Sequence, residues 1–266
     1  MVWRNPYYDP ALPHHTPQGF RNLEPSSRAP GDLQRWRQQR RQQRLPHPPT
    51  VGYAAYQRQW WQRAEVSGSE PACWWLGHAS VLLRVDGLTV ITDPVLSMRA
   101  SPVPFAGPKR RTPSALTVAE LPPIDAVLIS HNHYDHLDRA SVRALARRFP
   151  QAQFLVPLGL RRWLERQGVP RVSELDWWQS TRVGEAEFTC VPARHWSART
   201  PWDSNRSLWG GWVMRQRDFR FYFAGDTAYS PRLAEIGQRL GPFDLAALPI
   251  GAYAPRWFMQ SMHIDP

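Results

Sequence analysis

The sequence predicts an α/β fold in which helices cover layered β-sheets. Apolar runs with the length of strands alternate with segments of helical periodicity through most of the chain after residue 71. Several of these runs end next to a residue of a metal-ligating type, such as Asp93, His131 and Asp226. Strands that deliver such residues at one end indicate a scaffold with its chemistry collected along one rim.

Length and charge set the outline of the molecule. The 266 residues suit one large domain with an extension. We expect residues 1–70 to form a proline- and arginine-rich arm with short helices, and residues 71–266 to form the α/β domain. The 33 basic residues against 22 acidic residues give a net charge of +11. This charge favours an anionic partner, whether a phosphate substrate, an anionic membrane or a nucleic acid, and does not choose among them.

Two short helices are expected in the arm. Asp32 can cap a helix over 33–44, which carries five arginines and has little to bury. This helix is either a solvated surface helix or a basic patch for anionic lipid head groups. A second helix is predicted over 53–66 because aromatic residues recur there at three- and four-residue steps, a stripe that we interpret as core packing.

The domain is expected to alternate strands and helices. Asp86-Gly87 marks a hairpin turn, the proline-rich stretch 97–123 a long loop, and Asp138 the N-cap of a helix. The predicted strands cover 72–76, 79–85, 88–92, 125–130, 153–156, 171–175, 187–192, 208–215, 219–224 and 245–250. The predicted helices begin after Asp138 and cover 160–167 and 231–240.

Cysteine usage and the absence of targeting signals indicate a cytoplasmic protein. Cys73 and Cys190 each lie in an apolar strand-like run without a CxxC partner, so we expect buried free thiols. The first residues lack the apolar region of a signal peptide, and no apolar run approaches the roughly 18 residues of a membrane span. Contact with a membrane would then be peripheral.

One segment, Ser130 to Asp138, is unusually rich in metal-ligand types. In an extended chain, His131 and His133 can point to one side and grip one metal, while Asp135 and His136 turn toward a second. Imidazole and carboxylate without thiolate suit zinc, and also iron or manganese. The pattern His-x-His-x-Asp-His directly after an apolar strand is a strong metal-binding signal.

Two later residues match this motif in type and position. His195 follows a predicted strand, and Asp226 follows another, next to Gly225, which permits close backbone approach. The two oxygens of Asp226 could bridge two metals. Together they extend the local motif to a candidate two-metal site.

Taken in this order, these residues resemble the metallo-β-lactamase superfamily. Within it, the chain is similar over roughly residues 72–266 to the N-acylphosphatidylethanolamine-hydrolysing phospholipase D group. Beside the ligand motif, the blocks that carry this resemblance are Trp75-Leu76-Gly77-His78-Ala79-Ser80, Thr92-Asp93-Pro94, Phe223-Ala224-Gly225-Asp226-Thr227, Gly241-Pro242-Phe243-Asp244, Gly251-Ala252-Tyr253 and Pro255-Arg256-Trp257-Phe258-Met259. The fold it implies is a four-layer αββα sandwich.

The resemblance also implies a di-zinc centre and a reaction. His131, His133 and His195 would hold one zinc and Asp135 and His136 the other, with Asp226 between them; Asp135 and Asp226 are the catalytic carboxylates. A hydroxide formed there would attack phosphorus in line and release N-acylethanolamine and phosphatidic acid. Tyr134 and His263 would contact the lipid. We expect His78 and Asp93 to orient ligands from behind, although plain structural contacts explain them equally well.

The sequence departs from this family at its end. The His-Trp-Gly-Thr-like segment that supplies a further histidine to the second metal is absent, and the chain stops at Asp265-Pro266. We therefore expect a sandwich that lacks its last strand and helix, a second zinc that binds more weakly, and low or no activity. Association into a homo-oligomer is left open.

Other functions fit parts of the sequence. A lactonase or esterase of the same fold would act on a small phosphorylated substrate. A nuclease or nucleic-acid-binding protein is motivated by the charge alone and disfavoured, because the basic residues are scattered or lie in the arm and no recognised module is present. A catalytically impaired remnant that holds one metal as a scaffold is a further alternative.

Overall fold

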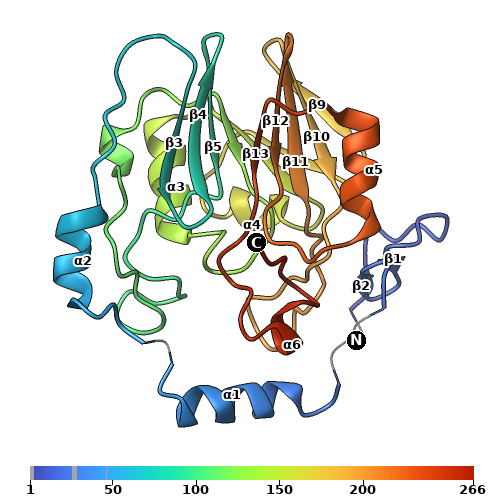
Figure 1. Ribbon diagram of the computed structural model, residues 1–266. Coiled ribbons are helices and arrows are strands. Elements are labelled where there is room, and N and C mark those ends of the chain that lie inside the picture. Colours follow the sequence, from blue (N-terminus) through green and yellow to red (C-terminus); the bar gives the residue numbers. More distant parts are fainter. Residues whose placement is uncertain (1–2, 26–28, 46) are drawn as a thin grey trace.

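Two β-sheets pack face to face in the computed structural model, which describes residues 3–25, 29–45 and 47–266 (Figure 1). The six-stranded sheet has the order β3 (Ala72–Gly77), β4 (Ser80–Val85), β5 (Leu88–Thr92), β6 (Ala126–Leu128), β7 (Gln153–Pro157) and β8 (Val172–Leu175). The five-stranded sheet has the order β13 (Leu245–Ala247), β12 (Phe219–Phe223), β11 (Gly211–Gln216), β10 (Ala186–Val191) and β9 (Ser180–Val183).

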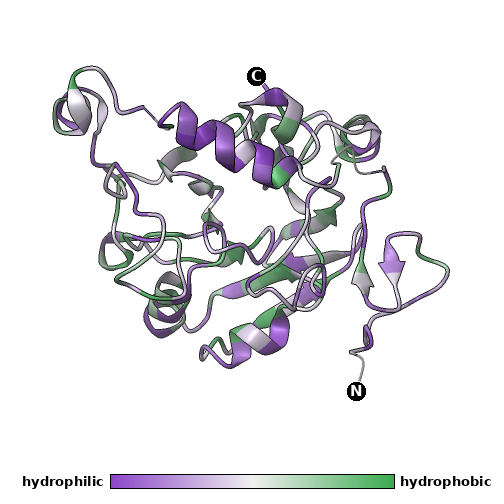
Figure 2. Cartoon of the chain, turned by 90° about the horizontal axis from the view of Figure 1, so that it is seen from below, coloured by the Kyte–Doolittle hydropathy of each residue, from purple (hydrophilic) through white to green (hydrophobic). Residues whose placement is uncertain are grey.

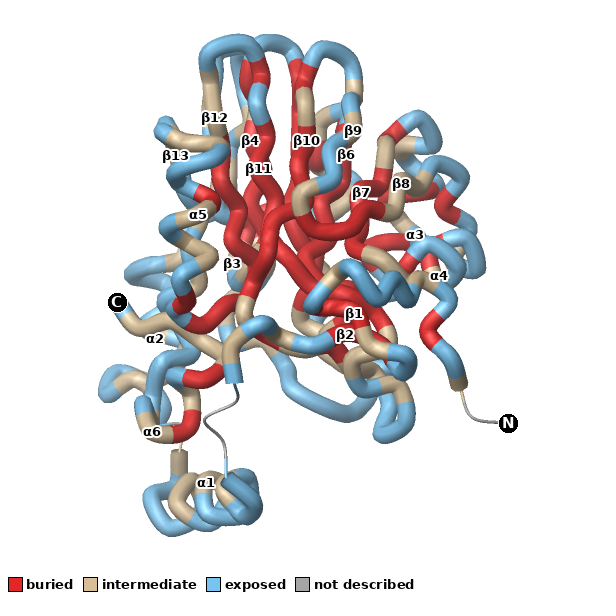
Figure 3. The backbone as a smooth tube through the Cα atoms, turned by 90° about the vertical axis from the view of Figure 1, so that its right-hand side faces the viewer, coloured by how far each residue is buried: buried red, intermediate tan, exposed pale blue. Residues whose placement is uncertain are grey.

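Alternation along the strands builds the core between the sheets. Leu83 and Val90 face inward and belong to the same buried cluster as Trp212 and Phe221 of the other sheet. Successive side chains of a strand point to opposite faces of the sheet. The side chains that alternate with these inward-facing residues therefore point away from the other sheet, and other elements must cover them on the outer face. Figure 3 shows the buried residues concentrated along the strands of both sheets.

Helices cover the two outer faces. The α3 helix (Arg139–Arg148) and α4 helix (Arg161–Glu165) pack on the six-stranded sheet, where Leu145 and Leu164 join a cluster with Ile91. On the five-stranded sheet, α5 (Pro231–Leu240) buries Ile236 against Val213 and its neighbours. The arrangement is the four-layer αββα sandwich expected from the resemblance.

The topology brings several strand ends to one rim. Strands β5 to β8 are parallel, so β5 and β6 end at the same edge of their sheet. At that edge the Nε1–H of Trp212 donates to the carbonyl of Ile129 (2.8 Å), and the N–H of Gly210 donates to the carbonyl of Ser130 (3.0 Å). These bonds tie the two sheets together just before the ligand motif begins.

The N-terminal segment, residues 3–25, folds back on the domain through a small hairpin of β1 (His15–Thr16) and β2 (Gly19–Phe20). The α1 helix (Asp32–Gln42) and α2 helix (Gly52–Trp60) follow, and neither contains a buried residue. Helix α1 lies across one end of the molecule and is largely hydrophilic (Figure 2). Its Trp36 stacks on Phe258 of α6 (Arg256–Met259), with ring centroids 5.1 Å apart.

Most predicted elements are confirmed, including two local signals. Asp138 caps α3 by accepting hydrogen bonds from the N–H groups of Ala140 and Ser141. Asp86 and Gly87 both have positive φ, +48° and +78°, as the tight turn between β4 and β5 requires. None of the described helices is long and apolar enough to cross a bilayer.

Several expectations about the less regular parts are wrong. Gly31, not Asp32, occupies the N-cap position of α1. The α2 helix stops at Trp60, whose side chain is 64% exposed, so the aromatic stripe does not pack into the core. Cys73 is exposed because it lies on edge strand β3, whereas Cys190 is buried in the middle of its sheet; both are free. The hairpin β1–β2, strand β9 and helix α6 were not predicted.

Candidate metal centre

The loop between β6 and α3 carries four candidate ligands in one tight turn. The N–H groups of His136 and Leu137 both donate to the carbonyl of His133, at 3.1 and 2.8 Å. Asp138 then starts α3. Because of this turn, neighbouring residues of the loop can point their side chains into two adjacent ligand groups. The four candidate ligands of the loop are His131, His133, Asp135 and His136.

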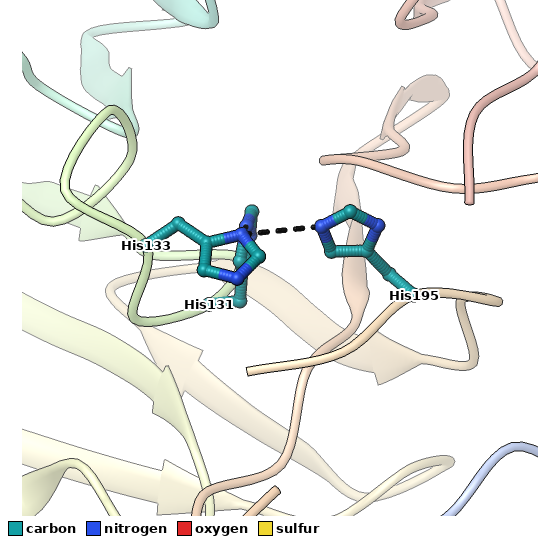
Figure 4. A group of neighbouring side chains, drawn as sticks. All are labelled: His131, His133 and His195. Carbon is teal, nitrogen blue, oxygen red and sulfur yellow. Dashed lines mark hydrogen bonds between the residues drawn. The ribbon is translucent and has the colours of Figure 1, made fainter. Parts of the chain in front are cut away.

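Three histidines converge from both sheets (Figure 4). His131 Nε2 lies 2.7 Å from His133 Nδ1, and His195 Nε2, from the loop after β10, lies 3.2 Å from the same atom. The His131 and His195 side chains are almost fully buried, each with 1% exposure. Burial lowers the pKa of His133 to about 4 and that of His195 to about 3, and holds the pKa of His131 well below its usual value.

Hydrogen bonds behind two of these rings set the tautomer. His195 Nδ1 donates to the carbonyl of Met262 (3.0 Å), and His131 Nδ1 contacts the hydroxyl of Ser130 (2.9 Å), which itself bonds to Asp93. In the neutral rings, Nε2 of each then carries a lone pair that faces His133. Both lone pairs converge on His133 Nδ1, and the three ring nitrogens lie close enough together to bind one cation, so this group fits a metal.

A second group lies beside the first. His136 Nε2 is 3.3 Å from Asp226 Oδ2 and 3.8 Å from Asp135 Oδ2. Burial alone would lower the pKa of His136, but the charges of these carboxylates and of Asp93 raise it well above its usual value. The pKa of Asp135 and that of Asp226 are held low: burial opposes this shift, and His136 provides the largest favourable effect.

The two groups meet at Asp226. Its Oδ2 also lies 3.7 Å from His195 Nε2, so one carboxylate faces both groups. It follows β12, and Gly225 before it has φ +60° and leaves no room for a Cβ beside Ser130. Metals bind neutral imidazoles and ionised carboxylates, so a cation in the second group would displace the proton that these carboxylates favour on His136. His136 Nε2, which faces the carboxylates, is buried without a hydrogen-bond partner among the described residues, and this also suits a metal ligand.

The two residues expected to orient ligands lie in different surroundings. Asp93 is fully buried, accepts the N–H of Ser130 (2.7 Å) and contacts His136 Nδ1 (2.6 Å). It therefore lies behind the second group. His78 is about half exposed and places Nε2 3.1 Å from Asp135 Oδ2, on the open side of the same group.

The two expected substrate contacts flank the centre. His263 Nδ1 lies 3.9 Å from Asp226 Oδ2, and its ring is 5.2 Å from that of His195. Tyr134 points its hydroxyl toward the carbonyl of Arg199, donating at 3.1 Å. All ten residues proposed from the sequence are thus near the rim, and His263 is close enough to belong to the cluster of candidate ligands.

Two contributors were missed by the sequence analysis. The Arg199 guanidinium donates to the carbonyls of Asn132 and Leu137, both at 2.8 Å, and so holds the two ends of the ligand loop. Asn22 bonds to the backbone of His195. Neither has a sequence signal, because each acts on a segment more than 60 residues away through ordinary hydrogen bonds.

Comparison with known proteins identifies the family. Residues 89–266 match the family described as the beta-lactamase superfamily domain. The chain is 46% identical over 202 residues to N-acyl-phosphatidylethanolamine-hydrolyzing phospholipase D 1 of Caenorhabditis elegans, which covers 72% of this chain and 57% of that protein. The chain spans about half the length of the curated relatives it matches.

Solved structures agree on the fold. Igni18, a metallo hydrolase from Ignicoccus hospitalis, superimposes with a TM-score of 0.53 at 23% identity, over 68% of this chain and 71% of that one. CmlA, a diiron beta-hydroxylase from Streptomyces venezuelae, gives a TM-score of 0.52 at 25% identity, over 81% of this chain and 46% of that one. The family match over residues 89–266 and the identity to the C. elegans relative show that the chain belongs to the metallo-β-lactamase superfamily.

Proposed function

We propose that this chain forms the catalytic domain of a zinc-dependent phosphodiesterase of the phospholipase D type. The reaction would release N-acylethanolamine and phosphatidic acid from N-acylphosphatidylethanolamine. The observation that carries the proposal is the convergence of three neutral imidazoles next to a carboxylate-rich group that shares Asp226 with them. The activity named for the C. elegans relative supports the choice of substrate.

Each side chain has a role in this proposal. His131, His133 and His195 hold one zinc, and Asp135, His136 and Asp226 hold the other. Two bound zinc ions supply a water of lowered pKa and stabilise charge on a phosphoryl oxygen.

The chain's own catalytic groups are two carboxylates. Asp226 presents Oδ2 between the two ligand groups, where it can accept a hydrogen bond from the attacking water and orient that water toward phosphorus. Asp135 is ionised and can accept a second hydrogen bond, while His78 Nε2 contacts its Oδ2 and helps to hold the carboxylate in place. Tyr134 and His263, which flank the centre, would contact the lipid head group.

The donor set favours zinc and makes the two groups unequal. Imidazole and carboxylate without thiolate suit zinc, iron and manganese. Since the first group has three imidazoles and the second only His136 with carboxylates and the half-exposed His78, we expect the second zinc to be lost first when a chelator is added. The similarity to CmlA favours one competing function, an iron-dependent oxygenation, in which purified chain would retain iron and release no N-acylethanolamine.

An anionic membrane is the proposed partner of the α1 face. Helix α1 buries no residue, and it and the turn after it carry Arg35, Arg37, Arg40, Arg41 and Arg44. Four of these arginines line a surface hollow of about 400 Å³ beside Trp36. A basic helix of this kind attracts anionic head groups, worth about 1 kcal/mol for each arginine near the surface. Such peripheral contact would bring the centre to its lipid substrate.

The test combines metal analysis with lipid hydrolysis. Wild-type protein, His133→Ala and His47→Ala are loaded with zinc, dialysed, analysed for metal, and incubated with vesicles containing N-acylphosphatidylethanolamine. His47 is exposed and lies outside both ligand groups, so its variant controls for loss of any histidine. We expect His133→Ala alone to lose tightly held zinc and the release of N-acylethanolamine. Equal zinc and equal release in all three proteins would overturn the proposal.

A further inference from the structure

The N-terminal segment reaches the metal centre although it lies outside the matched family domain, which begins at residue 89. It is fastened to the domain at several points along its length. Tyr7 donates its hydroxyl to Glu174 (2.8 Å), and His14 and His15 contact the two oxygens of Asp176 at 2.7 and 2.8 Å. The segment therefore follows a defined path over the surface.

Beyond the hairpin, the segment runs toward the loop that carries His195. The N–H of Phe20 donates to the carbonyl of Asn205 (2.8 Å), and the Phe20 ring is buried in the core between the sheets. Gly19 passes so close that a Cβ there would lie 2.1 Å from the same carbonyl oxygen. This close packing places the next residues beside the chain that leaves β10.

Asn22 then binds both backbone polar groups of His195. Its Nδ2 donates to the His195 carbonyl (2.8 Å), and its Oδ1 accepts the His195 N–H (3.1 Å). His195 lies outside the strand ladders, since β10 ends at Val191 and β11 begins at Gly211. His195 is almost fully buried, so its backbone N–H and carbonyl need hydrogen-bond partners from the protein rather than from water. Asn22 is the partner of both.

Other contacts complete the frame around this ligand. Arg194, the preceding residue, donates its N–H to Thr227 Oγ1 (3.0 Å) and a guanidinium N–H to the carbonyl of Pro25 (2.9 Å). With Nδ1 of His195 bonded to Met262, the ring has one orientation, in which Nε2 faces His133. Backbone and ring are thus fixed by different segments, and the N-terminal segment fixes the backbone.

We infer that Asn22 is a positioning residue of the metal centre, which makes the N-terminal segment a working part of the site. The inference rests on the proposed function in one respect, that His195 is a metal ligand. Without the paired bonds, the His195 backbone would move among alternative positions, and the ring nitrogen would meet the metal only part of the time. Loss of a partner that orients a metal ligand typically lowers metal affinity about 10- to 100-fold.

The experiment compares three variants by metal affinity. Asn22→Ala removes the paired bonds; Tyr7→Phe removes a bond between the same segment and the domain that does not touch a ligand; His195→Ala removes the ligand itself. Zinc affinity is measured by competition with a chromophoric chelator, cobalt-substituted protein gives the absorption spectrum of the first ligand group, and thermal unfolding in chelator gives the stability of the metal-free chain.

We expect Asn22→Ala to bind zinc at least about tenfold more weakly and to change the cobalt spectrum, while Tyr7→Phe keeps wild-type values for both. If Asn22→Ala lowers only the stability of the metal-free chain, with affinity and spectrum unchanged, its role is structural and the inference is wrong. If His195→Ala also keeps wild-type affinity, the ligand assignment of the proposed function fails instead. If the Asn22→Ala protein does not fold, Asn22→Ser takes its place, and its zinc affinity and cobalt spectrum are measured in the same way.

Discussion

Arg199 offers the most direct test of how the ligand loop is held in shape. Its guanidinium donates to the carbonyls of Asn132 and Leu137 and lies over the rings of Tyr134 and Trp163, with 4.0 and 4.8 Å to the centroids. Arg199→Met keeps the length and apolar packing of the side chain but removes both donors. The two carbonyls, which belong to buried residues, would then lose a charged partner.

The expected loss follows from these two bonds. A hydrogen bond from a charged donor contributes about 1.5 kcal/mol or more, so we expect the free energy of unfolding to fall by about 3 kcal/mol. For a domain of this size, that corresponds to a fall in the unfolding midpoint of about 6–12 °C. Zinc affinity should fall as well, because three of the four ligands of the loop, His133, Asp135 and His136, lie between the two carbonyls.

Thermal unfolding of the metal-free chain, followed by circular dichroism, measures the first effect, and chelator competition measures the second. Arg148→Met is the matched control, since Arg148 is exposed and lies over the Phe149 ring (5.2 Å) without touching the ligand loop. We expect it to change the midpoint by no more than about 2 °C, as a surface substitution does. An Arg199→Met protein that unfolds and binds zinc like Arg148→Met would refute the reasoning.

Three further predictions concern other buried groups. Burial opposes a low pKa for Asp176, but the two arm histidines bonded to it lower that pKa. Its contribution to stability is therefore present above about pH 4 and is lost as the pH falls through the lower folded value. Urea titrations should show a shallower acid slope in Asp176→Asn than in wild type, the remaining slope being due to other carboxyls of lowered pKa such as Asp135 and Asp226; equal slopes would contradict this. Gly225→Ala should lower the free energy of unfolding by about 2 kcal/mol or more, because φ is +60° and the new Cβ would lie 2.5 Å from that of Ser130; an unchanged chemical denaturation midpoint would contradict this steric argument. Asp93→Asn should weaken the second zinc by about 10- to 100-fold and the first zinc less, since it changes the direct partner of His136 Nδ1 but reaches His131 only through Ser130; equal chelator titrations of variant and wild type would rule this out.

Local patterns were enough to predict a layered α/β fold and the candidate ligands, whereas the four-layer sandwich was expected from the family resemblance. The strands from Ala72 to Thr92 are mostly apolar runs with the turn Asp86-Gly87 between the last two, and the cap at Asp138 lies within its own sequence neighbourhood. The ligand motif is equally local. Its meeting with His195 and Asp226 could be expected because all of them follow strands of a layered fold.

Features that depend on distant contacts were not predictable. Tyr56 and Trp60 have the spacing of a core-facing helix, yet both are exposed within the described part of the chain, and periodicity alone cannot reveal that. Cys73 has an apolar neighbourhood in sequence but falls on an edge strand. Asn22 and Arg199 have unremarkable neighbours, and their roles arise only when loops from different parts of the chain are brought together.

The division of the ligands between the two sheets has a thermodynamic consequence. One cation at the rim would be bound by side chains from the β6–α3 loop and by His195 and Asp226 from the opposite sheet, so it would link the halves of the sandwich as a crosslink does. Unfolded chain has no such arrangement, and binding therefore adds to the free energy of unfolding, by about 2.7 kcal/mol when free metal is 100 times its dissociation constant. The free energy of unfolding of this protein should therefore depend on the metal supply around it, and scarcity of that metal alone would lower it.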